Sequence, residues 1–142
     1  MFQGINWIAV LVAVVLQQVL GYVWYEPLFG AQWLAALGRE PDMSNVALNM
    51  SLGVVNTAII AVGLAWLIGR LGAHTLQGGV MTALAAWFFF NFTTMAIDYL
   101  YVGLSATLVG INMGYQLVAY LIAGAVLGFM KPKAAAAAPA AA

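Results

Sequence analysis

The amino-acid sequence predicts an all-α integral membrane protein, with four transmembrane helices in an up-down bundle and a short interfacial helix after the first span. Hydrophobic residues make up 65% of the 142 residues and charged residues only 6%, whereas soluble domains carry about 25% charged residues. The charges separate four apolar stretches, and each stretch supplies the about 20 residues that a helix needs to cross the hydrocarbon. The connections are short, which makes successive helices antiparallel neighbours.

The first span is expected at residues 5–25, followed by a short helix at 27–38. The chain begins without a basic segment, and its first apolar run is longer than the core of a signal peptide, so we expect this span to be retained. Pro27 ends the incoming helix and can begin another, and Gly38 is a natural C-terminal stop. One face of the short helix carries large apolar side chains: Phe29, Trp33 and Leu37. This pattern is typical of a helix lying in the membrane interface.

The other three spans are expected at residues 46–69, 79–97 and 105–130. Together with the first they form a single transmembrane domain over residues 1–130. The remaining residues, 131–142, are of low complexity in Ala and Pro and are predicted to be disordered.

The basic residues predict the orientation in the membrane. Arg70, Lys131 and Lys133 share one side with the N-terminus, and Arg39 lies on the other. Since basic residues concentrate on the cytoplasmic side, we expect both termini there. The four acids then lie on the outer side: Glu26, Glu40, Asp42 and Asp98.

Tryptophan and tyrosine residues gather near the expected ends of the spans, as in the aromatic belts of membrane proteins. The predicted interfacial anchors are Trp7, Trp24, Tyr25, Trp33 and Trp66. Trp87 lies in mid-span instead, so its indole N–H needs an acceptor there, for which Asn56 and an unwound backbone carbonyl are candidates.

Amide side chains are concentrated in the middle and outer parts of the spans. In hydrocarbon such groups need partners or water. They either join helices to one another or line an outward-opening pocket gated by a carboxylate, and both interpretations remain open. The pocket would comprise Gln17, Asn49, Asn56, Asn91, Asn112 and Gln116, with Glu26 or Asp98 at its mouth.

The fourth span carries small residues on one helical face, at alternating steps of four and three. This helix-packing face comprises Gly110, Gly114, Leu117, Leu121, Gly124 and Gly128. Such GxxxG spacing allows close approach of a second backbone, either inside the same bundle or in a homodimer. A similar stripe in the second span comprises Asn49, Gly53, Asn56, Ile60 and Gly63, and the two stripes are candidates to pack together.

Several classes of function find no support in the sequence. The chain has no cysteine, which excludes disulfides and thiolate metal sites, and its net charge of zero offers no basic surface for nucleic acid. His74 is the only histidine and has no evident catalytic partner, and no recognised catalytic motif is present. We therefore expect no enzymatic activity, no metal site and no cofactor.

Motifs in the first and fourth spans carry a family resemblance. They are Asn6-Trp7, Gly21-x-x-Trp24-Tyr25-x-Pro27, Phe29-Gly30-x-x-Trp33, Ile111-Asn112-x-Gly114-Tyr115, and Gly124-Ala125-Val126-Leu127-Gly128. Over residues 6–128 the chain resembles a bacterial membrane family known as domain of unknown function 1761. The resemblance implies one domain with four spans in the cytoplasmic membrane of a bacterium, and it implies no activity. Ala31 departs from the family pattern, since a basic residue often follows its Phe-Gly pair.

The sequence therefore predicts a small multi-pass membrane protein that acts through helix association, as a homodimer or as an accessory subunit of a membrane assembly. Its expected partners are the lipid bilayer and either copies of itself or other membrane subunits. The alternative is a small-molecule transporter or binding protein that uses the outward-facing polar pocket.

Overall fold

The computed structural model describes residues 4–41 and 44–132, and over these residues it is all-helical. Four helical spans are long and apolar enough to cross a membrane: Trp7–Leu28, Val46–Arg70, Leu76–Val102 and Ala106–Phe129. The predicted fold class is thereby confirmed, including the short helix after the first span. Most of the predicted disordered tail, and the acid Asp42, lie outside the described residues.

The first span continues past Pro27, where the sequence predicted its end. Helix α1 (Trp7–Val23) passes directly into a π-helix, η1 (Trp24–Leu28), that contains this proline. The backbone N–H of Phe29 donates to the carbonyl oxygen of Trp24 at 2.9 Å and closes the wide turn. Because proline has no N–H and its ring collides with the carbonyl four residues earlier in an α-helix, the wider turn accommodates it. Helix α2 (Gly30–Leu37) follows.

The third span is longer than predicted and contains a second π-helix. It consists of α4 (Leu76–Ala86), η2 (Trp87–Phe92) and α5 (Thr93–Val102). Two hydroxyls just after η2 bond to carbonyls within it, since Thr93 donates to Phe89 at 2.7 Å and Thr94 donates to Phe90 at 2.6 Å. Each hydroxyl thus has a partner within its own span, on the carbonyl four residues earlier.

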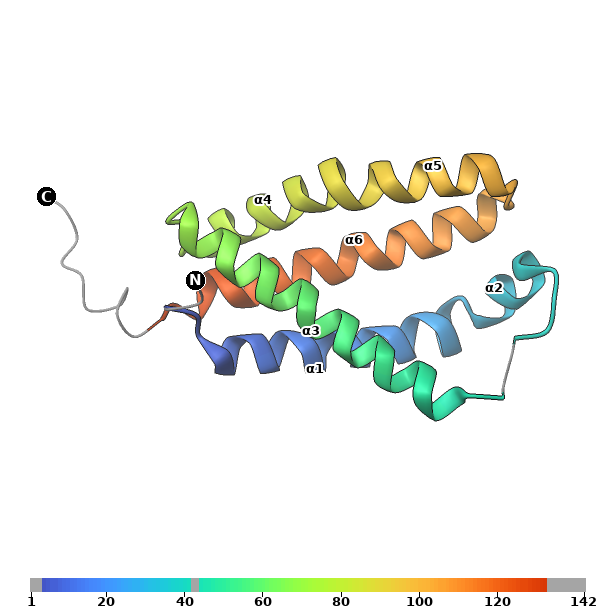
Figure 1. The fold of residues 1–142 in the computed structure, drawn as a ribbon, viewed down its shortest axis with the longest axis horizontal. Helices are drawn as coiled ribbons and strands as arrows, with labels where there is room; N and C mark the ends of the chain where they lie inside the picture. The colour runs from blue at the N-terminus through green and yellow to red at the C-terminus, as the bar shows by residue number, and fades with distance from the viewer. Residues whose placement is uncertain (1–3, 42–43, 133–142) are drawn as a thin grey trace, which may run out of the picture.

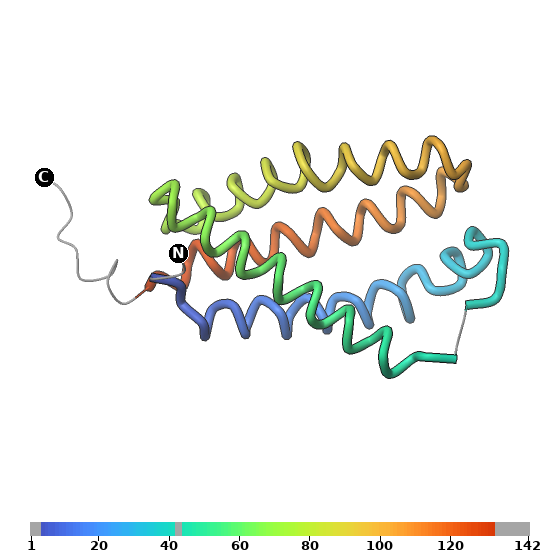
Figure 2. Tube along the Cα trace, viewed as in Figure 1, coloured from blue at the N-terminus to red at the C-terminus, as the bar shows by residue number. Residues whose placement is uncertain are grey.

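The second and fourth spans are regular α-helices, α3 (Val46–Arg70) and α6 (Ala106–Phe129). Helix α6 is central: α4 packs closely along one side of it and α1 along another (Figure 1). Figure 2 shows α3 crossing the bundle diagonally. We call the end that holds Asn6, Arg70 and Met130 the Arg70 end, and the opposite end, which holds α2, the Trp33 end.

The apolar core lies toward the Arg70 end. Its fully or nearly buried members are Ala9, Val10, Ala13, Val14, Ala61, Leu64, Ile68, Ala83, Ala123 and Leu127. None of them comes from the first half of α3, and every residue from Val46 to Asn56 is exposed. The bundle is therefore closed at the Arg70 end, while α3 diverges from it toward the Trp33 end (Figure 1).

Candidate functional site

The side chain of Asn112 on α6 joins three other elements near the Trp33 end. Its carbonyl oxygen Oδ1 accepts hydrogen bonds from the Tyr25 hydroxyl of η1, at 3.1 Å, and from the Trp33 indole of α2, at 3.2 Å. Its amide nitrogen Nδ2 donates to the Tyr99 hydroxyl of α5 at 3.0 Å. One amide thus connects the first span, the short helix and the third span to the fourth.

Aromatic rings surround this amide. The Tyr25 ring lies 5.7 Å from the Trp33 ring and 5.1 Å from the Tyr115 ring, centroid to centroid. The Trp24 indole donates to the backbone oxygen of Ile111 at 3.1 Å. We call this group the Asn112 cluster; its members are Trp24, Tyr25, Trp33, Tyr99, Asn112 and Tyr115.

Glycines provide the space that the rings of the cluster occupy. A methyl group at Gly21 would lie 3.3 Å from the Tyr115 hydroxyl, and one at Gly114 would lie 3.2 Å from the Trp24 ring. The glycine of each helix therefore receives an aromatic side chain of the other. The motifs that carried the family resemblance in the first and fourth spans meet here, which explains why aromatic residues and glycines recur together in them.

The chemistry of the Asn112 cluster is that of a structural clamp. Its polar atoms bond mainly to one another or to backbone carbonyls, and the acids nearest in sequence, Glu26 and Asp98, are exposed. No group of three or more His, Cys, Asp or Glu residues within the described part of the chain could hold a metal ion.

The residues of the predicted polar pocket are dispersed. Asn112 belongs to the cluster, whereas Gln17 is only 3% exposed and donates to the carbonyl of Ala13, on its own helix, at 3.2 Å. Asn49 and Asn56 are exposed on α3. Asn91 and Gln116 are half-buried, on η2 and α6. The structure does not bring these side chains into one group, and the pocket stays a prediction.

Trp87 and Asn91 stand out within η2. Trp87 is 9% exposed, and its indole nitrogen has no hydrogen-bond partner among the described residues. The Asn91 side-chain oxygen, one turn later, is also buried, and no described residue bonds to it. The sequence offered Asn56 as an acceptor for the indole, and that assignment is wrong because Asn56 is exposed on α3.

The predicted packing face of α6 is largely used inside the chain. A methyl group at Gly124 or at Gly128 would collide with Gly79 of α4, so backbones of the two helices are in direct contact there. Gly114 receives the Trp24 ring, while Leu117 and Leu121 are half-buried. Only Gly110 among the four glycines of this face borders open space.

The stripe on α3 has the opposite environment. A methyl group at Gly53 or at Gly63 would meet no atom within 4 Å. The side chains of Asn49 and Asn56 make no hydrogen bond among the described residues, although Gln18 of α1 donates to the neighbouring Thr57 at 3.2 Å. The expectation that this stripe packs against the α6 glycines is therefore wrong, since α4 occupies that place.

At the Arg70 end, Asn6 has a role that the sequence analysis missed. Its Oδ1 caps α1 by accepting from the backbone N–H groups of Ile8 and Ala9, and its Nδ2 donates to the carbonyl of Met130 at 3.2 Å. An asparagine directly before the first apolar run is a recognised start signal for a helix, and that signal could have revealed the cap. The bond to Met130 had no sequence signal.

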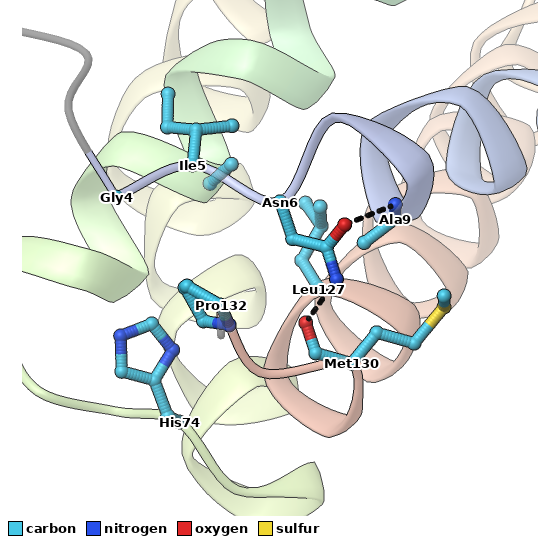
Figure 3. Close-up of a pocket in the computed structure, with 9 residues that line it drawn as sticks. Gly4, Ile5, Asn6, Ala9, His74, Leu127, Met130 and Pro132 are labelled. Atoms are coloured by element: carbon cyan, nitrogen blue, oxygen red, sulfur yellow. Dashed lines mark hydrogen bonds between the residues drawn. The ribbon is translucent and has the colours of Figure 1, made fainter. Parts of the chain in front are cut away.

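A small pocket adjoins Asn6 (Figure 3). Its volume of about 10 Å³ is close to the space that one water molecule needs. Figure 3 shows His74 and Asn6 on its wall, with Pro132 and Met130 from the segment after α6. The His74 Nδ1 atom is buried and has no partner among the described residues. The pocket has one unpartnered nitrogen and no second titratable group in its lining.

The predicted interfacial anchors divide into two groups. The polar atoms of Trp24, Tyr25 and Trp33 bond to α6, so these residues act inside the chain. Trp7 is exposed at the Arg70 end, and Trp66 at the same end lies 5.6 Å beneath the guanidinium of Arg70. Contact of these two indoles with lipid headgroups stays a prediction.

Comparison with known proteins gives one match. A family model described as "Protein of unknown function (DUF1761)" matches residues 8–128. No curated protein and no solved structure matches the chain.

Proposed function

Since the chain belongs to the DUF1761 family of proteins of unknown function, we propose from its own surfaces that it acts as a subunit of a membrane assembly. The first half of α3 makes the contact with the neighbouring subunit. The assembly lies in a bacterial cytoplasmic membrane, with the Arg70 end on the cytoplasmic side. The apolar helices imply a lipid bilayer as the surroundings of this contact.

The observation that carries the proposal is the exposed amide of Asn56. It follows the first residue of α3, Val46, by ten positions, or about 15 Å along the helix axis. That places it near the middle of a hydrocarbon layer about 30 Å thick. A polar side chain at this depth faces the bundle interior or a partner rather than lipid. In the part of the chain that the structure describes, the Asn56 side chain is exposed and has no hydrogen-bond partner.

The α3 surface is a better candidate for this contact than the α6 face that the sequence favoured. Gly114, Gly124 and Gly128 already receive groups from their own chain, so a substitution there alters the fold before it alters association. Gly53 and Gly63 of α3 border open space and leave the helix backbone accessible. Small residues beside a polar group are the usual composition of helix contacts in membranes.

The proposal can be tested by native mass spectrometry of the protein released from nanodiscs, which reports subunit number and bound small molecules together. We expect a species larger than one chain. Asn56→Leu combined with Gly53→Leu should lower its association constant about tenfold, as expected for the loss of one or two polar contacts and of close packing.

Gly110→Leu is the matched control, because Gly110 is an exposed helical glycine that also borders open space, but on α6. It should leave the assembly unchanged. If Gly110→Leu loses the assembly and the α3 variant keeps it, the interface lies on α6 and the proposed contact on α3 is wrong. A single chain that carries a reproducible non-lipid mass would overturn the proposal in favour of the polar pocket.

A further inference from the structure

We infer that the partner at this surface is a second copy of the chain, related by a two-fold axis along the membrane normal, with the Asn56 amides paired across the axis. The inference rests on the proposed function and specifies the partner. The contacting residues are those of the α3 stripe at its exposed end: Asn49, Gly53 and Asn56.

The spacing of the stripe fits a pair of parallel helices. Its residues, from Asn49 to Gly63, follow steps of four, three, four and three, which is the spacing of core positions in a heptad repeat. Ile60 packs against the chain's own core, so the part of this line that is free for a second helix is the exposed run Asn49, Gly53 and Asn56. Helices that meet along such a line cross at about 20° in a left-handed pair, the commoner geometry in membrane bundles. A single asparagine at such a position is known to determine register and the number of strands.

The chemistry of the stripe is self-complementary. A primary amide carries both donors and acceptors, so the same side chain on a second copy satisfies both. Copies inserted in the same orientation place their Asn56 residues at the same depth, which a two-fold axis along the membrane normal requires. A partner of another kind would have to bring its own polar group to that depth.

The surroundings of the stripe favour contact between identical surfaces. Residues 46–69 contain no charged side chain, so two copies meet without like-charge repulsion. Gly53 lies one turn from Asn56 and borders open space, which allows the two backbones to approach. Leu52 and Met50 are exposed and flank the stripe, where they can exclude lipid from the paired amides.

The absence of cysteine from the chain makes disulfide crosslinking a clean test. Single cysteines are introduced at Gly53 and Asn56, and oxidation is carried out in native membranes. We expect a disulfide-linked homodimer for Gly53→Cys, which keeps the amides of Asn49 and Asn56, and a smaller yield for Asn56→Cys, which removes the paired amide. Val54→Cys is the control on the same helix, because its side chain points away from the stripe while remaining exposed; it should crosslink several-fold less.

A second measurement uses the unmodified interface. Two differently tagged copies are co-expressed, and recovery of one tag with the other should be lost in Asn56→Leu combined with Gly53→Leu. Equal crosslinking at Gly53, Asn56 and Val54 would overturn the inference.

The inference and the proposed function fail in different ways. If native mass spectrometry shows an assembly that depends on α3, but no homodimer crosslinks and no tagged copy recovers the other, the partner is a different protein and only the inference is overturned. If native mass spectrometry shows a single chain, and crosslinking and tag recovery also show no dimer, the inference and the proposed function are both overturned.

Discussion

At the scale of single residues, Asn112 shows how one polar group organises an otherwise apolar bundle. Its amide bonds Tyr25, Trp33 and Tyr99, which belong to three different elements. Each of these side chains has its polar atom in a low-dielectric region, where an unsatisfied group is costly. The amide therefore stabilises one particular arrangement of the elements at the Trp33 end.

We predict that Asn112→Leu lowers the free energy of unfolding by about 2 kcal/mol, from three bonds worth about 0.6 kcal/mol each. Unfolding in mixed detergent micelles, at dilution where the chain is monomeric, measures this. Asn49→Leu is the matched control, since it removes an exposed side-chain amide that makes no hydrogen bond to residues 4–41 or 44–132. Equal stability of the two variants would show that the Asn112 bonds contribute nothing.

At the scale of elements, the contact of α4 with α6 brings two backbones close together and depends on glycine. A methyl group at Gly79 would overlap the backbone oxygen of Gly124. Lipid tails are as apolar as these helices, so the hydrophobic effect does not drive the helices together. They associate through dispersion and weak hydrogen bonds, and both need short distances. Any side chain at these glycines moves the backbones apart.

Gly79→Ala and Gly124→Ala should each lower stability by about 1–3 kcal/mol, the usual cost of overpacking a close contact. Thermal unfolding followed by circular dichroism measures the effect. Gly110→Ala makes the same change on α6 where nothing lies within 4 Å, and it should be neutral or slightly stabilising because alanine favours helix. A comparable loss in all three variants would contradict the packing argument.

The sequence predicted the number and order of the helices because charge and hydropathy determine which segments cross a membrane. It did not predict the π-helices η1 and η2. A π-helical turn holds about one residue more than an α-helical turn, and this difference leaves no trace in the apolar composition of the segment. The Asn112 cluster was only partly foreseen. Trp24, Tyr25 and Trp33 were assigned to an aromatic belt because an apolar helix gives no sign of which face meets protein and which meets lipid.

At the scale of the whole molecule, the charges of the described residues are separated between the two ends. Arg70 and Lys131 lie at the Arg70 end, whereas Glu26 and Asp98 lie on elements at the Trp33 end, together with Arg39 and Glu40. The excess of basic residues favours a cytoplasmic location for the Arg70 end.

Single cysteines at the two ends test this orientation. A membrane-impermeant maleimide applied to intact cells should label Glu40→Cys at the Trp33 end, and it should label Gln77→Cys, in the first turn of α4, only after permeabilisation. Both positions are exposed, so accessibility within the fold does not bias the comparison. The reverse pattern would invert the assigned topology.

The bond from Asn6 to Met130 has a consequence for biogenesis. Asn6 starts α1, and its acceptor Met130 lies 124 residues later, just after α6. Until that segment has been synthesised, the amide can cap α1 but cannot complete its second bond. Closure of the Arg70 end is therefore a late event of membrane insertion, and truncation within α6 would leave a bundle whose first and last helices are not joined.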